Sequence, residues 1–353
     1  MRVLITGATG FLGAWKAKAV ADRGHRLRLL VRDPDKLAPI ATAVGFDASD
    51  VVVGDMTDSD RVAAALQGCD AVIHAAAVVA LRPGEVDRMI ASNLAGAKNV
   101  VGQAVERGID PVVHVSSATA LWHRRCPLLH AGLSPCGGGD DYAESKVQVE
   151  HYIRELQRCG APIAVTYPWA VIGPAALDQY GESGEAIGAF IRSGVLGRGA
   201  AVTIADVRDV AEVHARLLEA GLGPRRYVLG GHRLSGAELA TQLTRITGRR
   251  VRHLPVPDAL LIGAGRIADR FRSRLPESLS KLSEAGTRYL TDVPPVDNSP
   301  AQTELGITFR PATEALEAML ADRARRRQAR QRDTTAAPPR SRPDDTEIAG
   351  PRA

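Results

Sequence analysis

A tyrosine and a lysine stand four residues apart in the run Tyr142-Ala143-Glu144-Ser145-Lys146. If this run is helical, the two side chains lie on one face of the helix, with the phenol beside the ammonium group. A free phenol has a pKa of about 10, and a neighbouring cation favours the phenolate, so the lysine would move that pKa toward the range in which proton transfer is efficient. The pair could act as an acid–base unit, although the same spacing also occurs by chance on surface helices.

Three glycines near the start of the chain indicate where such a unit would meet a cofactor. Gly7, Gly10 and Gly13 have the spacing Gly-x-x-Gly-x-x-Gly between an apolar run and a helical one. In a dinucleotide-binding turn the first glycine permits the tight bend, the second lets a pyrophosphate approach the backbone, and the third lets helix and strand pack closely. The phosphates then lie on the free N–H groups of the helix N-terminus. The predicted contact residues in this turn are Gly7, Thr9, Gly10, Phe11, Leu12 and Gly13.

The end of the second predicted strand indicates which nucleotide is bound. An NAD site usually places an acidic residue there for the ribose 2′-hydroxyl, whereas a 2′-phosphate needs a cation. Arg32 occupies this position, and its guanidinium suits a phosphate, which favours NADP. Asp33 follows immediately, so NAD stays possible.

Two later segments complete the predicted nucleotide site. Asp55 and Met56 are expected to lie under the adenine. Ala75 and Ala76 are small residues where the backbone must approach the cofactor, and His74 before them is interpreted as a packed strand-end residue rather than a base.

Short apolar runs alternate with helical stretches from residue 1 to about 175. This alternation predicts βαβ units and a parallel sheet, and the almost purely apolar strands fit burial on both faces. We therefore expect an α/β fold with a Rossmann-type, doubly wound parallel sheet. The predicted strands are Arg2–Thr6, Arg26–Val31, Val51–Val53, Ala71–His74, Pro111–Ser116 and Ile163–Tyr167, and two predicted helices are Arg61–Gln67 and Asn93–Arg107.

The alternation of strands and helices weakens after residue 175, and we predict three regions in the chain. Residues 1–175 form the dinucleotide-binding domain with the catalytic residues, residues 176–322 a smaller α/β substrate-binding portion with a lid, and residues 323–353 a disordered tail rich in arginine and proline.

Two patterns stand out in the second region. Ser235 and Glu238 have capping-box spacing and open a helix that Gly248 ends. The stretch Asp258–Leu275 is amphipathic and could touch a membrane surface, but packing as a lid over the substrate is the favoured interpretation.

Composition and charge exclude several classes of protein. No apolar run reaches the roughly 18 residues that span a bilayer, and the first residues already have the pattern of a strand instead of a leader. The four cysteines have neither Cys-x-x-Cys nor metal spacing, so we expect a cytoplasmic protein without a metal. The net charge of +5 comes from the tail, with nine arginines against four acidic residues after residue 322, so no nucleic-acid partner is expected. The expected partner is a small-molecule substrate, and a homodimer is an open alternative to a monomer.

Together these residues resemble the extended short-chain dehydrogenase/reductase family, which includes the NAD-dependent epimerases and dehydratases. The resemblance runs from residue 1 to about 322. Val31-Arg32-Asp33-Pro34 and Arg226-Tyr227-Val228-Leu229-Gly230-Gly231 are similar to the branch of dihydroflavonol reductases and 3β-hydroxysteroid dehydrogenases. The other motifs that carry the resemblance are Thr6–Gly13, Gly54–Asp58, His74–Ala77, Ser92–Gly96, Val115–Ala118, Tyr142–Lys146 and Ile172–Pro174.

The resemblance implies a role for each candidate residue. Tyr142 would be the general acid in reduction and the base in oxidation, and Lys146 would lower its pKa and hold the nicotinamide ribose. Ser117 would hydrogen-bond the substrate oxygen. Pro168 and Val171 would line the nicotinamide, which supplies the hydride.

Some positions depart from the family pattern. Lys16 stands where the first helix usually has an aliphatic residue, and Ala170 replaces an asparagine that sugar-nucleotide epimerases offer to their substrate. Trp169 beside it suits a less polar substrate, and Asn93 is expected to order a helix and a nearby loop.

These features favour an NAD(P)-dependent oxidoreductase that reduces a carbonyl or oxidises a secondary alcohol of a small, fairly apolar substrate. The alternative within enzymes is an NAD-dependent epimerase or dehydratase acting on a nucleotide sugar. A nucleotide-sensing protein without catalysis is a further alternative, but such relatives commonly lack the Tyr–Lys pair.

Overall fold

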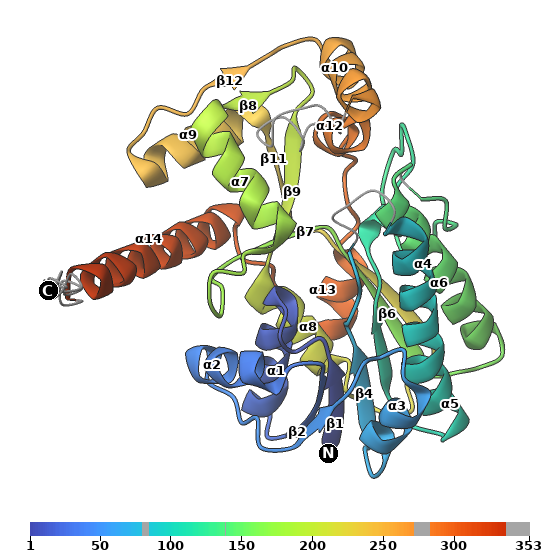
Figure 1. Ribbon diagram of the computed structural model, residues 1–353. Helices are drawn as coiled ribbons and strands as arrows, with labels where there is room; N and C mark the ends of the chain where they lie inside the picture. The colour runs from blue at the N-terminus through green and yellow to red at the C-terminus, as the bar shows by residue number, and fades with distance from the viewer. Residues whose placement is uncertain (80–84, 138, 272–282, 337–353) are drawn as a thin grey trace, which may run out of the picture.

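The computed structural model describes residues 1–79, 85–137, 139–271 and 283–336, and its larger part is a seven-stranded sheet (Figure 1). All neighbouring strands are parallel, in the order β10-β6-β5-β4-β1-β2-β3. The connections reverse direction between β1 and β4, which is where open α/β sheets bind ligands at their carboxyl edge. The strands are β1 Arg2–Thr6, β2 Arg26–Val31, β3 Val51–Val53, β4 Ala71–His74, β5 Val112–Val115, β6 Ile163–Pro168 and β10 Arg225–Leu229. The Rossmann-type fold is confirmed, and all six predicted strands form within one residue of their expected ends.

Helices cover both faces of this sheet (Figure 1). Val3 and Ile5 belong to one apolar cluster and Leu4 between them to the other, because successive strand residues point to opposite faces. The helices on the first face are α1 Phe11–Asp22, α8 Val207–Arg216 and α13 Ser299–Leu305, those on the second are α3 Ser59–Leu66, α4 Val86–Ala97, α5 Gln103–Glu106 and α6 Asp141–Arg158, and α2 Pro34–Val44 packs against α1. The helix predicted over Asn93–Arg107 begins instead at Val86, and a π-helical turn at Lys98–Gly102 interrupts it.

A smaller portion stands above the carboxyl edge of the sheet (Figure 1). Its apolar cluster contains Ile187, Leu239 and Leu316, which come from three different helices. The capping box of Ser235 and Glu238 opens one of them as expected. The elements here are β7 Ala170–Ile172, α7 Gly181–Ser193, β8 Val195–Leu196, β9 Ala201–Asp206, β11 His232–Ser235, α9 Gly236–Thr247, β12 His253–Leu254, α10 Asp258–Arg270 and α12 Glu284–Thr291.

The chain passes between the two portions more than once. After β9, helix α8 returns to pack on α1, and β10 pairs with β6 at the edge of the large sheet. The expected boundary at residue 175 therefore separates the two portions only up to β9, because the parallel sheet takes its last strand from beyond it.

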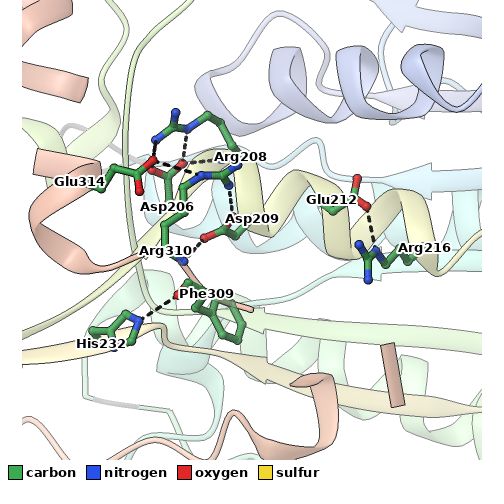
Figure 2. Close-up of polar contacts among 9 residues, drawn as sticks. All are labelled: Asp206, Arg208, Asp209, Glu212, Arg216, His232, Phe309, Arg310 and Glu314. Carbon is green, nitrogen blue, oxygen red and sulfur yellow. Dashed lines mark hydrogen bonds and ion pairs between the residues drawn. The ribbon is translucent and has the colours of Figure 1, made fainter. Parts of the chain in front are cut away.

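An ion-pair network ties α8 to the segment that leads into the last helix (Figure 2). Asp206 accepts a hydrogen bond from the Arg208 backbone and pairs with its guanidinium at 2.6 Å. Arg208 also lies 3.3 Å from Glu314, and Arg310 pairs with both Asp209 and Glu314. These contacts hold the last helix, α14 (Ala312–Ala336), against the smaller portion.

The position of α14 corrects the predicted start of the disordered tail at residue 323. The helix continues through residues 323–336, whereas residues 337–353 lie outside the described part of the chain. Arg326 pairs with Asp322 at 2.9 Å and donates to the carbonyls of Ala175 and Ala176, and Arg323 pairs with Glu185 at 2.6 Å. Helical spacing places these arginines where they meet acceptors on the body of the protein, so polar composition alone was a poor guide here.

Lys16 is fully buried, although a charged residue was not expected at this position of the first helix. Its amine has no hydrogen-bond partner among the described residues. Burial, with Lys146 adding to it, holds the pKa of Lys16 well below the usual value for lysine. Burial at this position therefore disfavours the charged form of the amine.

Candidate active site

The turn after β1 has close contacts that only glycine permits. Gly7 has a φ of 80°, and a Cβ atom there would lie 2.9 Å from the amide nitrogen of Ala76. A Cβ on Gly13 would overlap the carbonyl of Gly7, so the first turn of α1 can pack on the loop only with glycine at this place. A Cβ on Gly10 would meet nothing nearer than 3.4 Å, so its surroundings leave room for a ligand.

The N-terminus of α1 fits a phosphate. Gly10 is the residue before the helix, and no side chain caps the first N–H groups of α1. Uncapped N–H groups at a helix start attract anions, and a residue without a side chain lets them come close. Phe11 and Leu12 open the helix and Thr9 precedes the cap, so the predicted loop residues surround this position. The residues present therefore fit a dinucleotide pyrophosphate.

A buried Thr–His pair holds the second side of the nucleotide site. The Thr6 hydroxyl oxygen accepts from the backbone N–H groups of Ala75 and Ala76, both at 3.1 Å. With its lone pairs so used, the hydroxyl donates its hydrogen to Nδ1 of His74, 2.8 Å away, which makes His74 a neutral imidazole protonated at Nε2. Burial lowers the pKa of His74 to about 3, with Lys146 and Lys16 adding to the effect. His74 is thus a structural residue, as interpreted, and it orients the loop that faces Gly7.

The two charged residues after β2 have different surroundings. Asp33 caps α2 by accepting from the Asp35 backbone at 3.1 Å, and it pairs with Lys36 at 3.3 Å. Arg32 has an exposed side chain, and its guanidinium lies 3.9 Å from the carboxylate of Asp55. The acid that could hold a ribose 2′-hydroxyl is therefore occupied, whereas the guanidinium remains accessible.

Asp55 and Met56 follow β3 at the same edge of the sheet. Asp55 accepts from the backbone and the hydroxyl of Thr57, so it stabilises its own turn. The side chain of Met56 is buried and packs against Gly96, where a Cβ would lie 2.6 Å from its sulfur. Met56 can therefore meet an adenine only through its backbone.

Helix α6 presents the Tyr–Lys pair as its spacing predicts. Asp140 caps the helix by accepting from the Ala143 backbone at 2.7 Å, which positions the first turn. The amine of Lys146 lies 5.7 Å from the ring centre of Tyr142. Ser117, at the end of β5, is buried, and its hydroxyl lies 2.9 Å from that of Thr119.

The pKa of Tyr142 is shifted upward, whereas a neighbouring lysine was expected to shift it downward. Burial raises the pKa of Tyr142 to about 12, with Glu182 and Asp140 adding to the rise and a hydrogen bond with Ser117 opposing it. Burial lowers the pKa of Lys146 to about 8, and the carboxylate of Glu150 opposes that change. In this state desolvation outweighs any help from the lysine, so the phenol is protonated at neutral pH. The Ser117 hydroxyl stands beside that phenol.

A family model decides the identity of the chain. The model of the NAD dependent epimerase/dehydratase family matches residues 3–230, which is well over half of the chain. The chain belongs to this family. Its predicted resemblance to the extended short-chain dehydrogenases/reductases is confirmed, and the protein is an NAD(P)-dependent oxidoreductase of that type.

Relatives of this family member include reductases and dehydrogenases. Sterol demethylase protein B of Methylococcus capsulatus is 28% identical over 316 residues, covering 87% of this chain and 93% of the relative. Cinnamoyl-CoA reductase 1 of Oryza sativa is 28% identical over 70% of this chain and 76% of the relative. A 3 beta-hydroxysteroid dehydrogenase/Delta 5-->4-isomerase of Mycobacterium tuberculosis is 30% identical over 43% of this chain and 42% of the relative.

Solved structures of similar proteins share the whole fold. The crystal structure of gox2253 has a TM-score of 0.73 and 26% identity, covering 92% of this chain and 98% of that one. UDP-glucose-4-epimerase from Stenotrophomonas maltophila, solved with NAD, has a TM-score of 0.72 and 22% identity, covering 93% and 99%.

No cluster of His, Cys, Asp and Glu among the described residues is suited to a metal ion. In the same part of the chain, every helix is too short or too polar to cross a bilayer.

Asn93 links helix α6 to the loop after β4. Its amide nitrogen donates to Ser145 at 2.8 Å, and its amide group exchanges hydrogen bonds with the backbone N–H and C=O of Val78. Asn93 is buried, so it orders this loop as interpreted. Pro168 is the last residue of β6, and Val171 lies in β7, the next strand along the chain.

Two functional candidates that lie far from Tyr142 in the sequence, Glu182 and Tyr289, were not predicted from it. Glu182 in α7 lies close enough to raise the pKa of Tyr142. Tyr289 in α12 packs its ring on Trp122, with 4.9 Å between ring centres, and burial raises its pKa, with Asp140 and Tyr142 adding to the rise. These residues come from distant parts of the chain, so no spacing pattern connects them with Tyr142.

Glu150 forms a buried cluster one turn beyond Lys146. Its carboxylate accepts from Arg154 at 2.6 Å and from the hydroxyl of Tyr167, while its second oxygen has no partner among the described residues. Tyr142, Lys146 and Glu150 are each four residues apart and so share one helix face. A fully buried negative charge at this place favours the cationic form of Lys146.

Glu150→Gln should move the alkaline limit of activity to lower pH. In the parent the pKa of Lys146 is about 8, and the carboxylate of Glu150 raises it. The neutral amide of the variant lacks this effect, so the lysine should lose its proton at a lower pH than in the parent. We expect kcat/KM at pH 8 to fall several-fold, with little change near pH 6.5, in a pH profile of carbonyl reduction. Tyr167→Phe is the matched control, because it removes a hydrogen bond but keeps the carboxylate. Superimposable profiles for the parent and Glu150→Gln would show that Glu150 has no influence on Lys146.

Proposed function

We propose that this protein transfers a hydride between NADP and a ketone or secondary alcohol in a fairly apolar substrate. The observation that carries the proposal is that Ser117, which follows β5, and Lys146 both lie beside Tyr142. A protonated phenol next to a serine hydroxyl is suited to a carbonyl oxygen that gains negative charge.

In the reductive direction Tyr142 is the proton donor. Its O–H donates to the carbonyl oxygen while the carbonyl carbon receives the hydride that reduced nicotinamide supplies when bound. Ser117 donates a hydrogen bond to the same oxygen, and the product is the alcohol together with a tyrosinate that takes its proton back from solvent. Lys146, as a cation below pH 8, stabilises that tyrosinate.

The substrate class is inferred from the surroundings of the phenol. Tyr289 lies next to Tyr142 and packs on the fully buried Trp122, and Trp169 is half-buried against the same apolar cluster. Flat aromatic surfaces favour a substrate with an extended apolar body. Two relatives are named for sterols or steroids, which fits a polycyclic alcohol or ketone as the substrate.

The preference for NADP rests on the two residues after β2. The carboxylate of Asp33 is used by α2 and Lys36, and Arg32 is the accessible charge at the end of the strand. A ribose 2′-phosphate gains two parallel hydrogen bonds from a guanidinium, whereas a 2′-hydroxyl needs the acid.

Arg32→Ala should weaken NADPH selectively. We expect its KM for NADPH to rise by about tenfold or more, since a charge-assisted pair with phosphate contributes roughly 1.5–3 kcal/mol. The KM for NADH should change by less than about twofold. Steady-state kinetics with both cofactors measures this, and an equal effect on the two would count against a 2′-phosphate at Arg32.

The reaction itself is tested by absorbance at the nicotinamide band. Purified protein is mixed with NADPH or NADH and a panel of steroid ketones, aromatic aldehydes and nucleotide sugars. We expect consumption of NADPH with the apolar ketones. Conversion of a nucleotide sugar without net cofactor consumption would instead support the epimerase or dehydratase alternative.

A further inference from the structure

Among the described residues, the two large apolar side chains with the highest exposed fraction both lie on helix α10. Leu260 is 64% exposed and Ile267 63%, whereas the next large apolar side chain, Val53, is 49% exposed. Phe271, at the end of the helix, is 44% exposed. Side chains of this size are normally placed in a core, so their gathering on one helix indicates a surface that meets something apolar.

These residues form one stripe on the helix. Leu260, Ala264, Ile267 and Phe271 are spaced by four, three and four residues, which places them on one face. All four are exposed. We call them the α10 stripe.

The opposite face of α10 is already used for packing. Gly265 lies so close to α12 that a Cβ there would be 2.6 Å from the carbonyl oxygen of Ser283. Arg266 pairs with Glu284 at 2.9 Å, and Asp269 accepts from the Glu284 backbone at 2.9 Å. The α10 stripe therefore does not hold the helix in place, and it points away from α12. The expectation that this stretch packs as a lid does not explain the stripe, and residues 272–275 of that stretch lie outside the described residues.

Arginines outnumber acidic residues in the segment that leads into α10 and ends at Phe271. Between Arg249 and Phe271 the chain has five arginines against two aspartates. Arg270 is exposed on α10 beside the stripe, and Arg252 is exposed in the segment that leads into the helix. In Figure 1 α10 lies at the outer end of the smaller portion, away from the N-terminus and the large sheet.

We propose that the α10 stripe docks the protein on an anionic lipid bilayer. An amphipathic helix with large apolar residues on one side and arginines beside them lies in the interface, with its apolar side among the acyl chains and its cations at the headgroups. A second copy of the chain is a less suitable occupant, because arginines beside the stripe would repel their equivalents across a two-fold axis. The proposal goes beyond the proposed reaction, since docking requires neither cofactor nor substrate.

The test is flotation with vesicles in the absence of cofactor and substrate. We expect the full chain to float with vesicles of phosphatidylglycerol and phosphatidylcholine, and to float less with phosphatidylcholine alone or at high salt. The double variant Leu260→Ser/Ile267→Ser should bind at least about tenfold more weakly, because two large side chains lose most of their transfer free energy. Arg270→Glu should weaken binding only to the anionic vesicles.

Leu222→Ser is the matched control. Leu222 is 45% exposed in the loop between α8 and β10, so its replacement removes a similar apolar side chain elsewhere. Melting temperatures of all variants should match the parent within a few degrees, since each side chain is exposed. Failure of the parent to float, or equal binding of the double variant and the parent, would overturn the proposal. A parent dimer that the double variant dissociates would also overturn it, because a second copy would then cover the stripe.

Discussion

Tyr142→Phe is expected to lower kcat/KM for carbonyl reduction by about a thousandfold, since a positioned proton donor contributes roughly 10²–10⁴-fold. The substitution removes one oxygen and keeps the ring that Lys146 faces at 5.7 Å. Because the phenol in the parent is protonated far above neutral pH, the loss should be the same from about pH 6 to about pH 8. Steady-state kinetics in that range measures it.

Cofactor binding separates this result from damage to the site. The glycine turn, Arg32 and Lys146 are untouched in Tyr142→Phe, so the Kd for NADPH should stay within about twofold of the parent. Thermal unfolding should be unchanged as well. A variant that turns over substrate as fast as the parent would exclude Tyr142 as the proton donor.

The second large effect is expected from Gly13→Ala. A Cβ at this position would overlap the carbonyl oxygen and carbon of Gly7. These two atoms belong to the backbone and cannot rotate away. We expect the free energy of unfolding to fall by about 3 kcal/mol and cofactor binding to be lost with it. Urea unfolding monitored by circular dichroism measures the first quantity.

Gly10→Ala is the partner experiment, because this position has room for a methyl group but faces the expected phosphates. Its Cβ would lie 3.4 Å from the nearest protein atom, and its φ of −89° suits alanine. The free energy of unfolding should therefore fall by no more than about 1 kcal/mol, the cost of alanine before a helix. The Kd for NADPH should rise by about tenfold or more, because the methyl group blocks the approach of the pyrophosphate. Unchanged cofactor affinity in Gly10→Ala would place the phosphates elsewhere.

Local patterns were enough to predict most of the large sheet. The strands are apolar and short because both faces are covered, so their ends coincide with the ends of apolar runs. The capping box of Ser235 and Glu238 and the turn at Gly7 are also defined within a few residues. Such features depend on neighbours in the chain and can therefore be recognised from spacing.

Polar composition misled the prediction of the last helix. Arg323 pairs with Glu185 and Arg326 donates to the carbonyls of Ala175 and Ala176, and folding of the body supplies these acceptors. Likewise Asp33, which the sequence offers as a partner for a ribose hydroxyl, caps α2 in the folded chain. The same residue type can serve either purpose, and only its partners distinguish them.

By itself the sequence determined the family, the Rossmann-type sheet, the glycine turn and the four-residue spacing of Tyr142 and Lys146, because each of these is a local pattern. The tertiary structure alone decided the chemistry around that pair. It buried the phenol enough to raise its pKa to about 12, and it brought Glu182 and Tyr289 beside it from helices far along the chain. Desolvation and contacts between distant segments depend on how the whole chain packs, and no spacing in the sequence records them.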